Sequence, residues 1–509
     1  MQTKIENVLK RILLIITLLM YGFLFVFSFL FSWENSSDLA DEHVYRMNDS
    51  LLLNIGGAII VALLIFVIGK CFSRADERKI DIIATCLFGL TTIFCIYWVF
   101  ASGTAPQADQ LKICTAASEM NAGDYSFLQK GGYLAECPHQ LGIVTVLRIL
   151  FAVFGDGNYK SFQVLSALSV FLLLNSGYYI VKDLSGNKVA GGLYVLASIT
   201  CFPMIFYTAF VYGEIISTAF IMLAFWMLIS LFDEFKVYKL VCLFLGLAIS
   251  VFVRENSLIP AVAILGILII KTILYRKKTF VYALVVSLFA VFCASVITSA
   301  LYSSHTPDDA NSMPSILYIA MGTNDAGGYS GWYDGSNFDL FEENDCDPEL
   351  ASEAAKAVLA DRLNDYKNSP IEAVMFYIRK ICAQWSAPMY QSIAMNNNIV
   401  DEQSGLAEAI YYNASVKDFL DSFMNIHQLA VFFAMIVWII KEWNVSVHLE
   451  KYVILITIFG GFLFSIIWEA KSRYVFPYYV MMIPLAVIGM MEIYYLLDSG
   501  FSRKKSKRI

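Results

Sequence analysis

Charged side chains beside apolar runs are the first candidates for chemistry in this sequence. Asp109 follows such a run by a few residues in TAPQADQ (104–110), and Arg254 opens RENSLIP (254–260) between two others. Lys471 and Arg473 lie in WEAKSRYVFP (468–477). An aspartate can take the proton of an attacking hydroxyl, and guanidinium and ammonium groups can bind a phosphodiester and stabilise its leaving oxygen. This combination suggests a reaction in which a lipid-anchored phosphate leaves and a hydroxyl attacks.

Further polar residues border the same apolar runs and could contact a substrate. They are Tyr133, Glu136 and His139 in GGYLAECPHQLG (131–142), Glu214 in FVYGEIIS (210–217), and Glu469 and Tyr474 in the last motif. Ionisable groups at membrane depth are costly, so we treat them as functional candidates.

Each candidate also has a purely structural interpretation. Asp109 could mark the end of a span, and the polar residues of 131–142 could be solvated in a loop. Glu214 could favour a helix start through the helix dipole. Arg254 could extend to the interface with Glu255 as its ion-pair partner, and the basic pair at 471–473 could anchor a helix end.

Composition excludes several classes of protein. Of the 509 residues, 58% are hydrophobic and 16% are charged, and the mean hydropathy is +0.63. In ordinary soluble domains about 45–50% of the residues are apolar and about 25% are charged. A water-soluble fold, a disordered scaffold and a nucleic-acid-binding domain are therefore excluded. The five His and ten Cys form no C-x-x-C or H-E-x-x-H pattern. The sequence thus predicts no metal site or cofactor, although a divalent ion stays an open alternative.

The elements that position the candidates are transmembrane helices, each of which needs about 20 mostly apolar residues. The apolar runs predict an all-α polytopic membrane protein, embedded in a lipid bilayer, with twelve spans near 12–32, 52–69, 82–100, 161–181, 189–207, 215–232, 239–253, 257–275, 280–302, 421–440, 452–468 and 475–497. The run 141–154 is short for a span, and we expect it to be an interfacial or re-entrant helix.

Basic residues assign the two sides of the membrane. If 141–154 does not cross, 22 of the 36 Lys and Arg lie in short loops and tails on one side, including YRKKT (275–279) and RKKSKR (503–508). The positive-inside rule makes this side cytoplasmic. We therefore expect a multi-pass protein of the cell membrane with both termini in the cytoplasm, the N-terminal run as an uncleaved anchor, and the candidate residues at the outer boundary.

The chain divides into four parts. They are two N-terminal spans (1–79), a transmembrane core with a first outer loop at 101–160 (80–302), an acidic outer segment (303–420), and the C-terminal spans with a basic tail (421–509). In the acidic segment, 349–382 predicts a helix and 322–339 a loop. Four cysteines fall outside, and the hypothesis of disulfides Cys114–Cys137 and Cys346–Cys382 stands against unpaired thiols.

These motifs resemble those of polytopic GT-C class glycosyltransferases, particularly bacterial enzymes related to protein mannosyltransferases and lipid A aminoarabinose transferases. The resemblance rests on the outer loop with Asp109, YLAECPHQLGIV (133–144), RENSLI (254–259) and E-x-K-x-R-Y-x-x-P at 469–477. It covers about residues 80–497. It implies a GT-C-like bundle with extracytoplasmic juxtamembrane helices, with Asp109 as general base and Arg254, Lys471 and Arg473 as ligands of the donor phosphate.

The resemblance also implies a reaction, namely transfer of a hexose from a polyprenyl-phosphate-linked donor, with inversion, to an extracytoplasmic cell-wall polymer, glycolipid or protein. The sequence departs from the family pattern because Asp109 lacks an adjacent acid and Cys-Pro-His occupies 137–139. Metal use and acceptor class therefore stay open. The alternative is a lipid-linked oligosaccharide flippase, a polymerase or another transporter. Transporter sites are expected near the midplane between related halves, and no internal duplication is evident here.

Overall fold

The apolar runs form long helices in the computed structural model of the protein, which describes residues 2–35, 44–325, 330–445 and 448–506. Within these ranges the chain forms 21 α-helices and one two-stranded sheet, so the predicted all-α polytopic class is confirmed. Ten helical segments are long and apolar enough to cross a bilayer. They contain α1 (Gln2–Leu30), α2 (Leu51–Arg74), α3 (Glu77–Ala101), α7 (Tyr159–Ser185), α10 (Glu214–Asp233), α12 (Leu258–Tyr275), α13 (Lys278–Tyr302), α19 (Ala414–Glu442), α20 (Val453–Ile467) and α21 (Ser472–Ser506).

Two further segments complete the predicted set of twelve. The apolar helix α11 (Val237–Val253) is shorter and joins α10 to α12. The run predicted as one span at 189–207 is instead broken into α8 (Lys188–Ile199) and α9 (Phe202–Phe206), which continues into a 3-10 turn, with a bend of 56°. Pro203 lacks an N–H and disfavours helical geometry in the residue before it, which explains the break.

A histidine satisfies the backbone at this break. The Ala197 carbonyl accepts a hydrogen bond from His427 Nε2 (2.8 Å), and the other ring nitrogen of His427 bonds the Tyr479 hydroxyl. His427 therefore connects α8 to α19 and α21, and it supplies a partner to a carbonyl that a continuous helix would have satisfied.

The run 141–154 forms α6 (Leu141–Phe154), and the segment before it bends sharply. The helical pieces Ser126–Glu136 and Pro138–Phe154 meet at 100°, a geometry that fits the expected re-entrant or interfacial helix. This approach contains α5 (Tyr133–Glu136), and α6 packs beside α4 (Asp109–Asn121) and α11. A Cβ on Gly142 would lie 1.6 Å from the Phe252 carbonyl oxygen, so only glycine allows α6 to approach α11 this closely.

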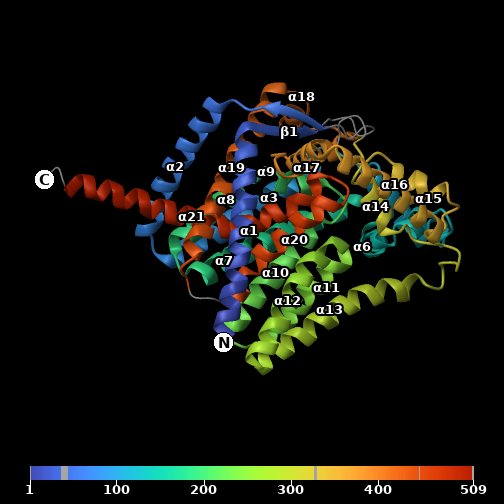
Figure 1. Cartoon of the computed structure of the whole chain (residues 1–509), viewed down its shortest axis with the longest axis horizontal. Helices are drawn as coiled ribbons and strands as arrows, with labels where there is room; N and C mark the ends of the chain where they lie inside the picture. The colour runs from blue at the N-terminus through green and yellow to red at the C-terminus, as the bar shows by residue number, and fades with distance from the viewer. Residues whose placement is uncertain (1, 36–43, 326–329, 446–447, 507–509) are drawn as a thin grey trace.

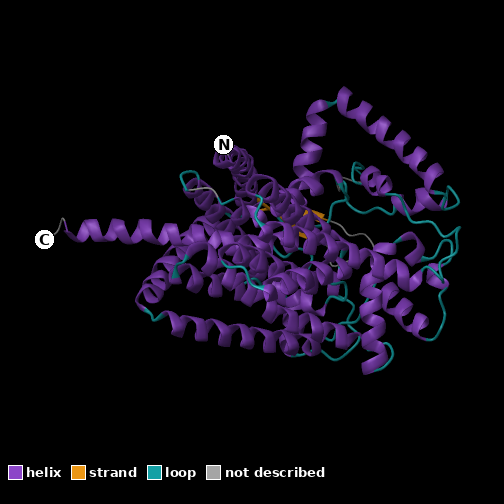
Figure 2. Ribbon diagram, turned by 90° about the horizontal axis from the view of Figure 1, so that it is seen from below, coloured by secondary structure: helices purple, strands orange, loops and turns teal. Residues whose placement is uncertain are grey.

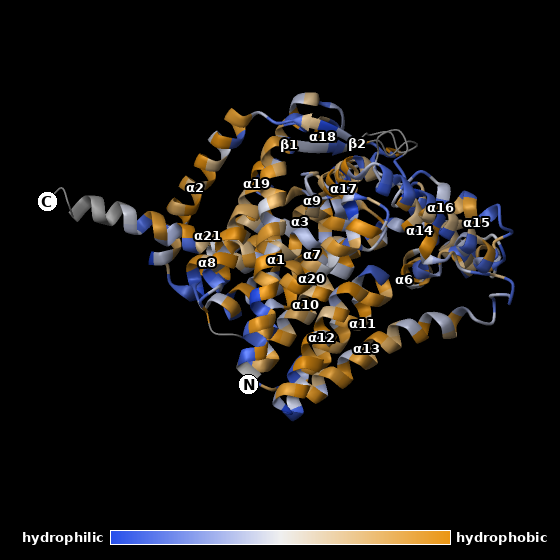
Figure 3. Ribbon diagram, in the orientation of Figure 1, coloured by the Kyte–Doolittle hydropathy of each residue, from blue (hydrophilic) through white to orange (hydrophobic). Residues whose placement is uncertain are grey.

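The segment between α13 and α19 contributes short helices outside the bundle, namely α14 (Ser315–Met321), α15 (Ser336–Glu342), α16 (Pro348–Asn368), α17 (Pro370–Trp385) and α18 (Gly405–Tyr412). The single helix predicted over 349–382 is two helices because Pro370 starts a new one. The predicted loop 322–339 holds the start of α15, and its residues 326–329 lie outside the described ranges. Hydrophilic residues gather over α14–α16, whereas the bundle is hydrophobic (Figure 3).

A hairpin that the sequence reasoning did not anticipate joins α1 to α2. The strands β1 (Phe31–Asn35) and β2 (Val44–Asn48) pair antiparallel with Phe31 opposite Asn48. The Trp33 amide donates to the Ser386 carbonyl oxygen (3.1 Å). This bond ties the hairpin to the end of α17.

The helix α21 forms the centre of the bundle, where it packs against α19, α8, α2, α7 and α20. In the most apolar 18-residue stretch of α21, 72% of the residues are buried, compared with 17% in that of α2 and 28% in that of α13. The latter two lie at the periphery in Figure 1, and their exposed side chains suit contact with lipid. The C-terminal part of α21 extends beyond the bundle (Figure 2).

A buried ionic cluster fixes one end of the bundle. Lys271 at the end of α12 pairs with Glu6 of α1 (2.9 Å) and with Glu450 before α20 (2.6 Å). Because α12 begins with the RENSLIP segment, the chemistry-bearing residues lie at the opposite end.

The cysteine hypothesis is wrong, since all ten cysteines are free. Cys137 contacts the Tyr318 hydroxyl (3.7 Å) rather than Cys114, and Cys346 donates to Glu136 Oε1 (3.7 Å). Cys346 and Cys382 belong to separate hydrophobic clusters. The prediction relied on each outer segment having two cysteines, and this number does not indicate which side chains the fold brings together.

Candidate functional site

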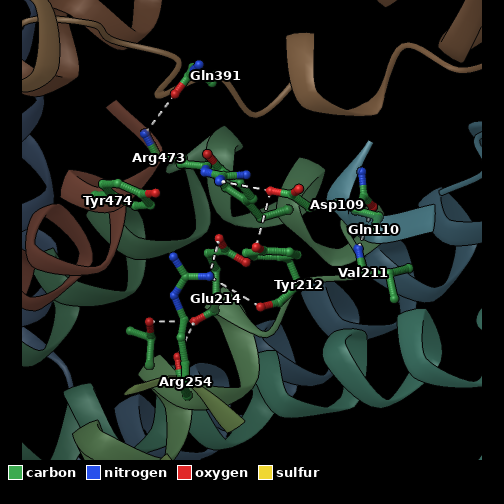
Figure 4. A network of polar contacts seen from close by, with 12 residues as sticks. Asp109, Gln110, Val211, Tyr212, Glu214, Arg254, Gln391, Arg473 and Tyr474 are labelled. Atoms are coloured by element: carbon green, nitrogen blue, oxygen red, sulfur yellow. Dashed lines mark hydrogen bonds and ion pairs between the residues drawn. The ribbon is translucent and has the colours of Figure 1, made fainter. Parts of the chain in front are cut away.

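The turn Phe210–Gly213, which precedes α10, is the scaffold of the candidate site. Gly213 has φ = +91°, and a Cβ there would lie 2.7 Å from Val253 Cγ1, so this position requires glycine. The Val211 amide donates to Gln110 Oε1 (2.8 Å), which joins the turn to α4. Glu214 therefore begins its helix two residues after Tyr212, which lies between Glu214 and Asp109 in Figure 4.

Asp109 begins α4, and the strand-like segment before it is bonded along its length to residues 395–404. The Ala105 amide donates to the Asn398 carbonyl (2.9 Å), Gln107 Nε2 to Asn397 Oδ1 (2.8 Å), and Gln110 Nε2 to the Met395 carbonyl (3.1 Å). These bonds hold the chain where Ala108 takes a left-handed φ of +45° immediately before the aspartate. The position of the Asp109 carboxylate thus depends on a segment almost 300 residues away.

The Asp109 carboxylate meets a tyrosine and an arginine. The Tyr212 hydroxyl donates to Asp109 Oδ2 (3.3 Å), and Arg473 Nη2 lies 3.9 Å from the same oxygen. The Asp109 side chain is 36% exposed and Arg473 is 3% exposed. The carboxylate can therefore be reached from outside while the guanidinium beside it stays fixed.

Arg473 is held by its own backbone and by aromatic rings. Its amide donates to Gln391 Oε1 (3.1 Å), and its guanidinium carbon lies 5.0 Å from the Tyr212 ring centroid and 5.3 Å from that of Tyr474. Tyr390 and Gln391 both have left-handed backbone, with φ of +49° and +60°. Two consecutive strained residues of these types indicate that the surrounding structure holds Gln391 in place.

Arg254 forms a buried ion pair, but not with the residue that the sequence reasoning offered. Its Nη1 lies 2.7 Å from Glu214 Oε1, and the two side chains are 10% and 1% exposed. The same Nη1 donates to the Tyr212 carbonyl (3.3 Å). The suggested pairing with Glu255 is wrong, because α10 begins beside α11 and brings Glu214 closer.

A cavity of about 620 Å³ adjoins this cluster. Its polar wall includes Glu136, His139, Gln140, Tyr212, Arg254, Glu255, Asn256, Glu469 and Tyr474, together with Ser295, Thr298, Ser312 and Ser315. Its apolar wall comes from α11, α12, α13 and α20, with Val251, Leu258, Ala294 and Trp468 among its residues. A cavity of this size and mixed lining suits an amphipathic small molecule.

The protein environment changes the ionisation of two cavity groups that lie outside the spans. The surrounding protein and the Arg254 charge lower the pKa of His139, although its side chain is exposed where it lines the cavity. Burial and the nearby Glu342 raise the pKa of Glu136.

The remaining predicted residues are divided between the cavity and a neighbouring loop. The Tyr474 hydroxyl donates to Glu469 at the cavity wall, and the Tyr133 hydroxyl lies 3.5 Å from that of Tyr212. Lys471, in contrast, lies over the Tyr333 ring at 4.5 Å and does not line the cavity. The backbone explains this: the Ala470 amide donates to the Gly331 carbonyl (2.6 Å), which draws the segment before α21 toward the 330–335 loop.

Sequence reasoning missed four residues that organise the site, namely Gln110, Gln140, Tyr212 and Gln391. Three of them had a weak signal, because Gln110 follows Asp109, Gln140 follows His139 and Tyr212 lies two residues before Glu214. Nothing near Gln391 in the sequence indicates its bond to Arg473. Among the described residues, no three His, Cys, Asp or Glu side chains are grouped as metal ligands would be.

Part of the chain matches a known protein family. Residues 8–336 match a family described as "conserved hypothetical integral membrane protein". This range includes Asp109, Tyr212, Glu214 and Arg254 and ends before the motif with Arg473. No curated protein and no solved structure matches the chain.

Proposed function

Because the chain belongs to this family of conserved integral membrane proteins, whose description names no reaction, we propose its activity from the site: it is a membrane glycosyltransferase. It transfers a hexose from a polyprenyl-phosphate-linked donor to an extracytoplasmic acceptor such as a cell-wall polymer, glycolipid or protein. The motifs that resemble GT-C enzymes, together with the contacts of the site, support this proposal.

One observation carries the proposal: Asp109 Oδ2 lies 3.9 Å from Arg473 Nη2, beside a cavity that Arg254 lines. A base and two guanidinium groups are the chemistry that the transfer needs. The acceptor hydroxyl gives its proton to Asp109 as its oxygen bonds the anomeric carbon. The bond from that carbon to the phosphate oxygen breaks, and its electron pair leaves with polyprenyl phosphate. Attack from the opposite face gives inversion.

The two arginines have a definite task in this reaction. Arg473 and Arg254 bind the phosphate and stabilise the charge that develops on the leaving oxygen. Arg254 pairs with Glu214 through Nη1 alone, and a guanidinium carries five N–H donors, so it can serve both partners. Lys471 was expected to be a third phosphate ligand. Neither Lys471 nor Arg473 lines the cavity, but Arg473 lies 3.9 Å from Asp109 Oδ2 whereas Lys471 lies over the Tyr333 ring, which makes Lys471 the weakest of the three assignments.

The lining of the cavity supports a lipid-linked substrate. The polar wall includes Arg254, while the walls from α11, α12 and α20 are mostly apolar and α13 contributes Ala294, Ser295 and Thr298. The exposed hydrophobic residues of α13, such as Phe289 and Phe292, lie along the helix that carries one of these walls. A polyprenyl-phosphate donor could place its phosphate at the polar wall and its hydrocarbon chain along the apolar wall.

The proposal includes an orientation, with the site on the outer side and both termini in the cytoplasm. The positive-inside rule supports it, since Arg276, Lys277 and Lys278 lie at the end opposite the site. Single cysteines in a cysteine-free variant test it. A membrane-impermeant maleimide added to intact cells should label a cysteine at exposed Glu349 but not one at exposed Lys277, and the reverse pattern would refute the orientation.

The activity is tested by incubating purified protein with a panel of polyprenyl-phosphate sugars and measuring release of polyprenyl phosphate. Release with at least one sugar is expected. The alternative class, a flippase or other transporter, would move the intact donor across proteoliposomes without release. The broken span α8–α9 is the feature that this class would use, but His427 and Tyr479 fill its break.

A further inference from the structure

Tyr212 contacts three charged groups of the candidate site, namely Asp109, Arg254 and Arg473. Its hydroxyl lies 3.3 Å from Asp109 Oδ2, and its carbonyl accepts from Arg254 Nη1. Its ring centroid lies 5.0 Å from the guanidinium carbon of Arg473 and 5.5 Å from that of Arg254. Figure 4 shows the residue between the Asp109–Arg473 pair and the Arg254–Glu214 pair.

The hydrogen-bond directions of the hydroxyl single out the aspartate. Gln140 Nε2 lies 2.6 Å from the Tyr212 oxygen and, as an amide N–H, must donate to it. The Tyr212 oxygen thereby accepts from Gln140, and its one proton is left to donate. The Tyr133 hydroxyl is more distant (3.5 Å), and a carboxylate is the stronger acceptor, so the proton points toward Asp109.

The ring has a separate role. Two guanidinium groups repel each other, and an aromatic face attracts both. Tyr212 also forms part of the cavity wall, whereas Asp109 does not. One side chain thus faces the donor cavity with its ring and the base with its hydroxyl.

We infer that Tyr212 is a positioning residue for both halves of the transfer. Its hydroxyl orients the Asp109 carboxylate toward the acceptor, and its ring orients Arg254 and Arg473 toward the donor phosphate. This inference rests on the proposed function. It separates the two kinetic parameters: the hydroxyl affects kcat, and the ring affects the KM for the donor.

Two variants of the full-length protein test the separation, with an accepted polyprenyl-phosphate sugar as substrate. Tyr212→Phe removes only the hydroxyl and should lower kcat about 5- to 30-fold, with the donor KM within about twofold of wild type, because a hydrogen bond to a charged group is lost. Tyr212→Leu removes the ring as well and should also raise the donor KM at least about fivefold.

A matched control comes from another buried tyrosine. Tyr194 in α8 is 3% exposed and lies outside the site. Tyr194→Phe should leave kcat and KM within about twofold of wild type. If Tyr212→Phe fails to fold, Gln140→Leu provides the second variant. It removes the donor that directs the Tyr212 proton and should lower kcat.

The outcomes distinguish the inference from the proposed function. An active wild type whose Tyr212→Phe variant keeps full kcat would overturn the inference while leaving the function intact. The inference would also be overturned if Tyr212→Phe and Tyr212→Leu changed the same kinetic parameter by the same factor. A wild type that releases no polyprenyl phosphate from any donor would overturn both.

Discussion

The buried pair Arg254–Glu214 gives a quantitative prediction about stability. The two side chains are 10% and 1% exposed, and no other ion pair with Glu214 exists among the described residues. Removing one partner leaves the other charge buried without compensation, which costs about 3–5 kcal/mol. We therefore expect Glu214→Gln and Arg254→Gln each to lower the free energy of unfolding by that amount, although glutamine nearly preserves the shape of glutamate.

The double variant supplies the decisive comparison. Glu214→Gln with Arg254→Gln removes both charges and leaves two neutral amides, so it should be less destabilised than the sum of the single variants by about 2 kcal/mol or more. For 509 residues, an unfolding entropy of about 2 cal/mol/K per residue makes each kcal/mol about 1 °C in Tm. The single variants should therefore melt about 3–5 °C lower in detergent.

A surface pair is the control for this cycle. Lys356–Glu353 is a helical contact whose side chains are 59% and 72% exposed, and Glu353→Gln should change Tm by less than about 1 °C. Single-variant losses below about 1 °C, or additivity of the two substitutions, would refute the view that the fold depends on this ion pair.

Three further predictions concern other parts of the molecule. Alkylation of the unfolded, unreduced protein should modify all ten cysteines by mass spectrometry, and two missing labels would indicate a bridge that the structure lacks. Gly142→Ala should reduce the yield and Tm of the folded protein because its Cβ would meet the Phe252 carbonyl, whereas Gly266→Ala, where the space is open, should be neutral or stabilising. Burial lowers the pKa of Lys380, outside the spans, to about 7, below about 10.4 in the unfolded chain. The unfolded state therefore binds more protons between these values, stability should rise from about pH 7 to 10, and Lys380→Met should flatten that rise relative to wild type.

Hydropathy predicted most of the helical architecture because the bilayer imposes a minimum apolar length on every span. It predicted twelve spans, ten of which correspond to long apolar helical segments, and the charge distribution led us to expect that α6 does not cross. It missed the break at Pro203 and the division at Pro370, although proline marks both positions in the sequence. The hairpin after α1 was missed because its strands are five residues each and lie between long apolar runs.

The site was predictable in its charged residues but not in the contacts that arrange them. Asp109, Arg254 and Arg473 are rare ionisable groups beside apolar runs, so their cost in a membrane revealed them. The partner of Arg254 was missed because Glu255 is adjacent in sequence, whereas Glu214 is adjacent in space. Gln391 and the 395–404 segment could not be found, because their hydrogen bonds reach residues on other helices and leave no local pattern.

The most direct test of the central claim compares wild type with Asp109→Asn, using the polyprenyl-phosphate sugar that the protein accepts and measuring polyprenyl phosphate released. The substitution removes the base and keeps the size of the side chain. Loss of a general base predicts a fall in rate of about 10²–10⁴, with an unchanged Tm showing that the variant is folded. Wild-type rates in a folded Asp109→Asn variant would contradict the assignment of Asp109 as the base and, with it, the proposed reaction.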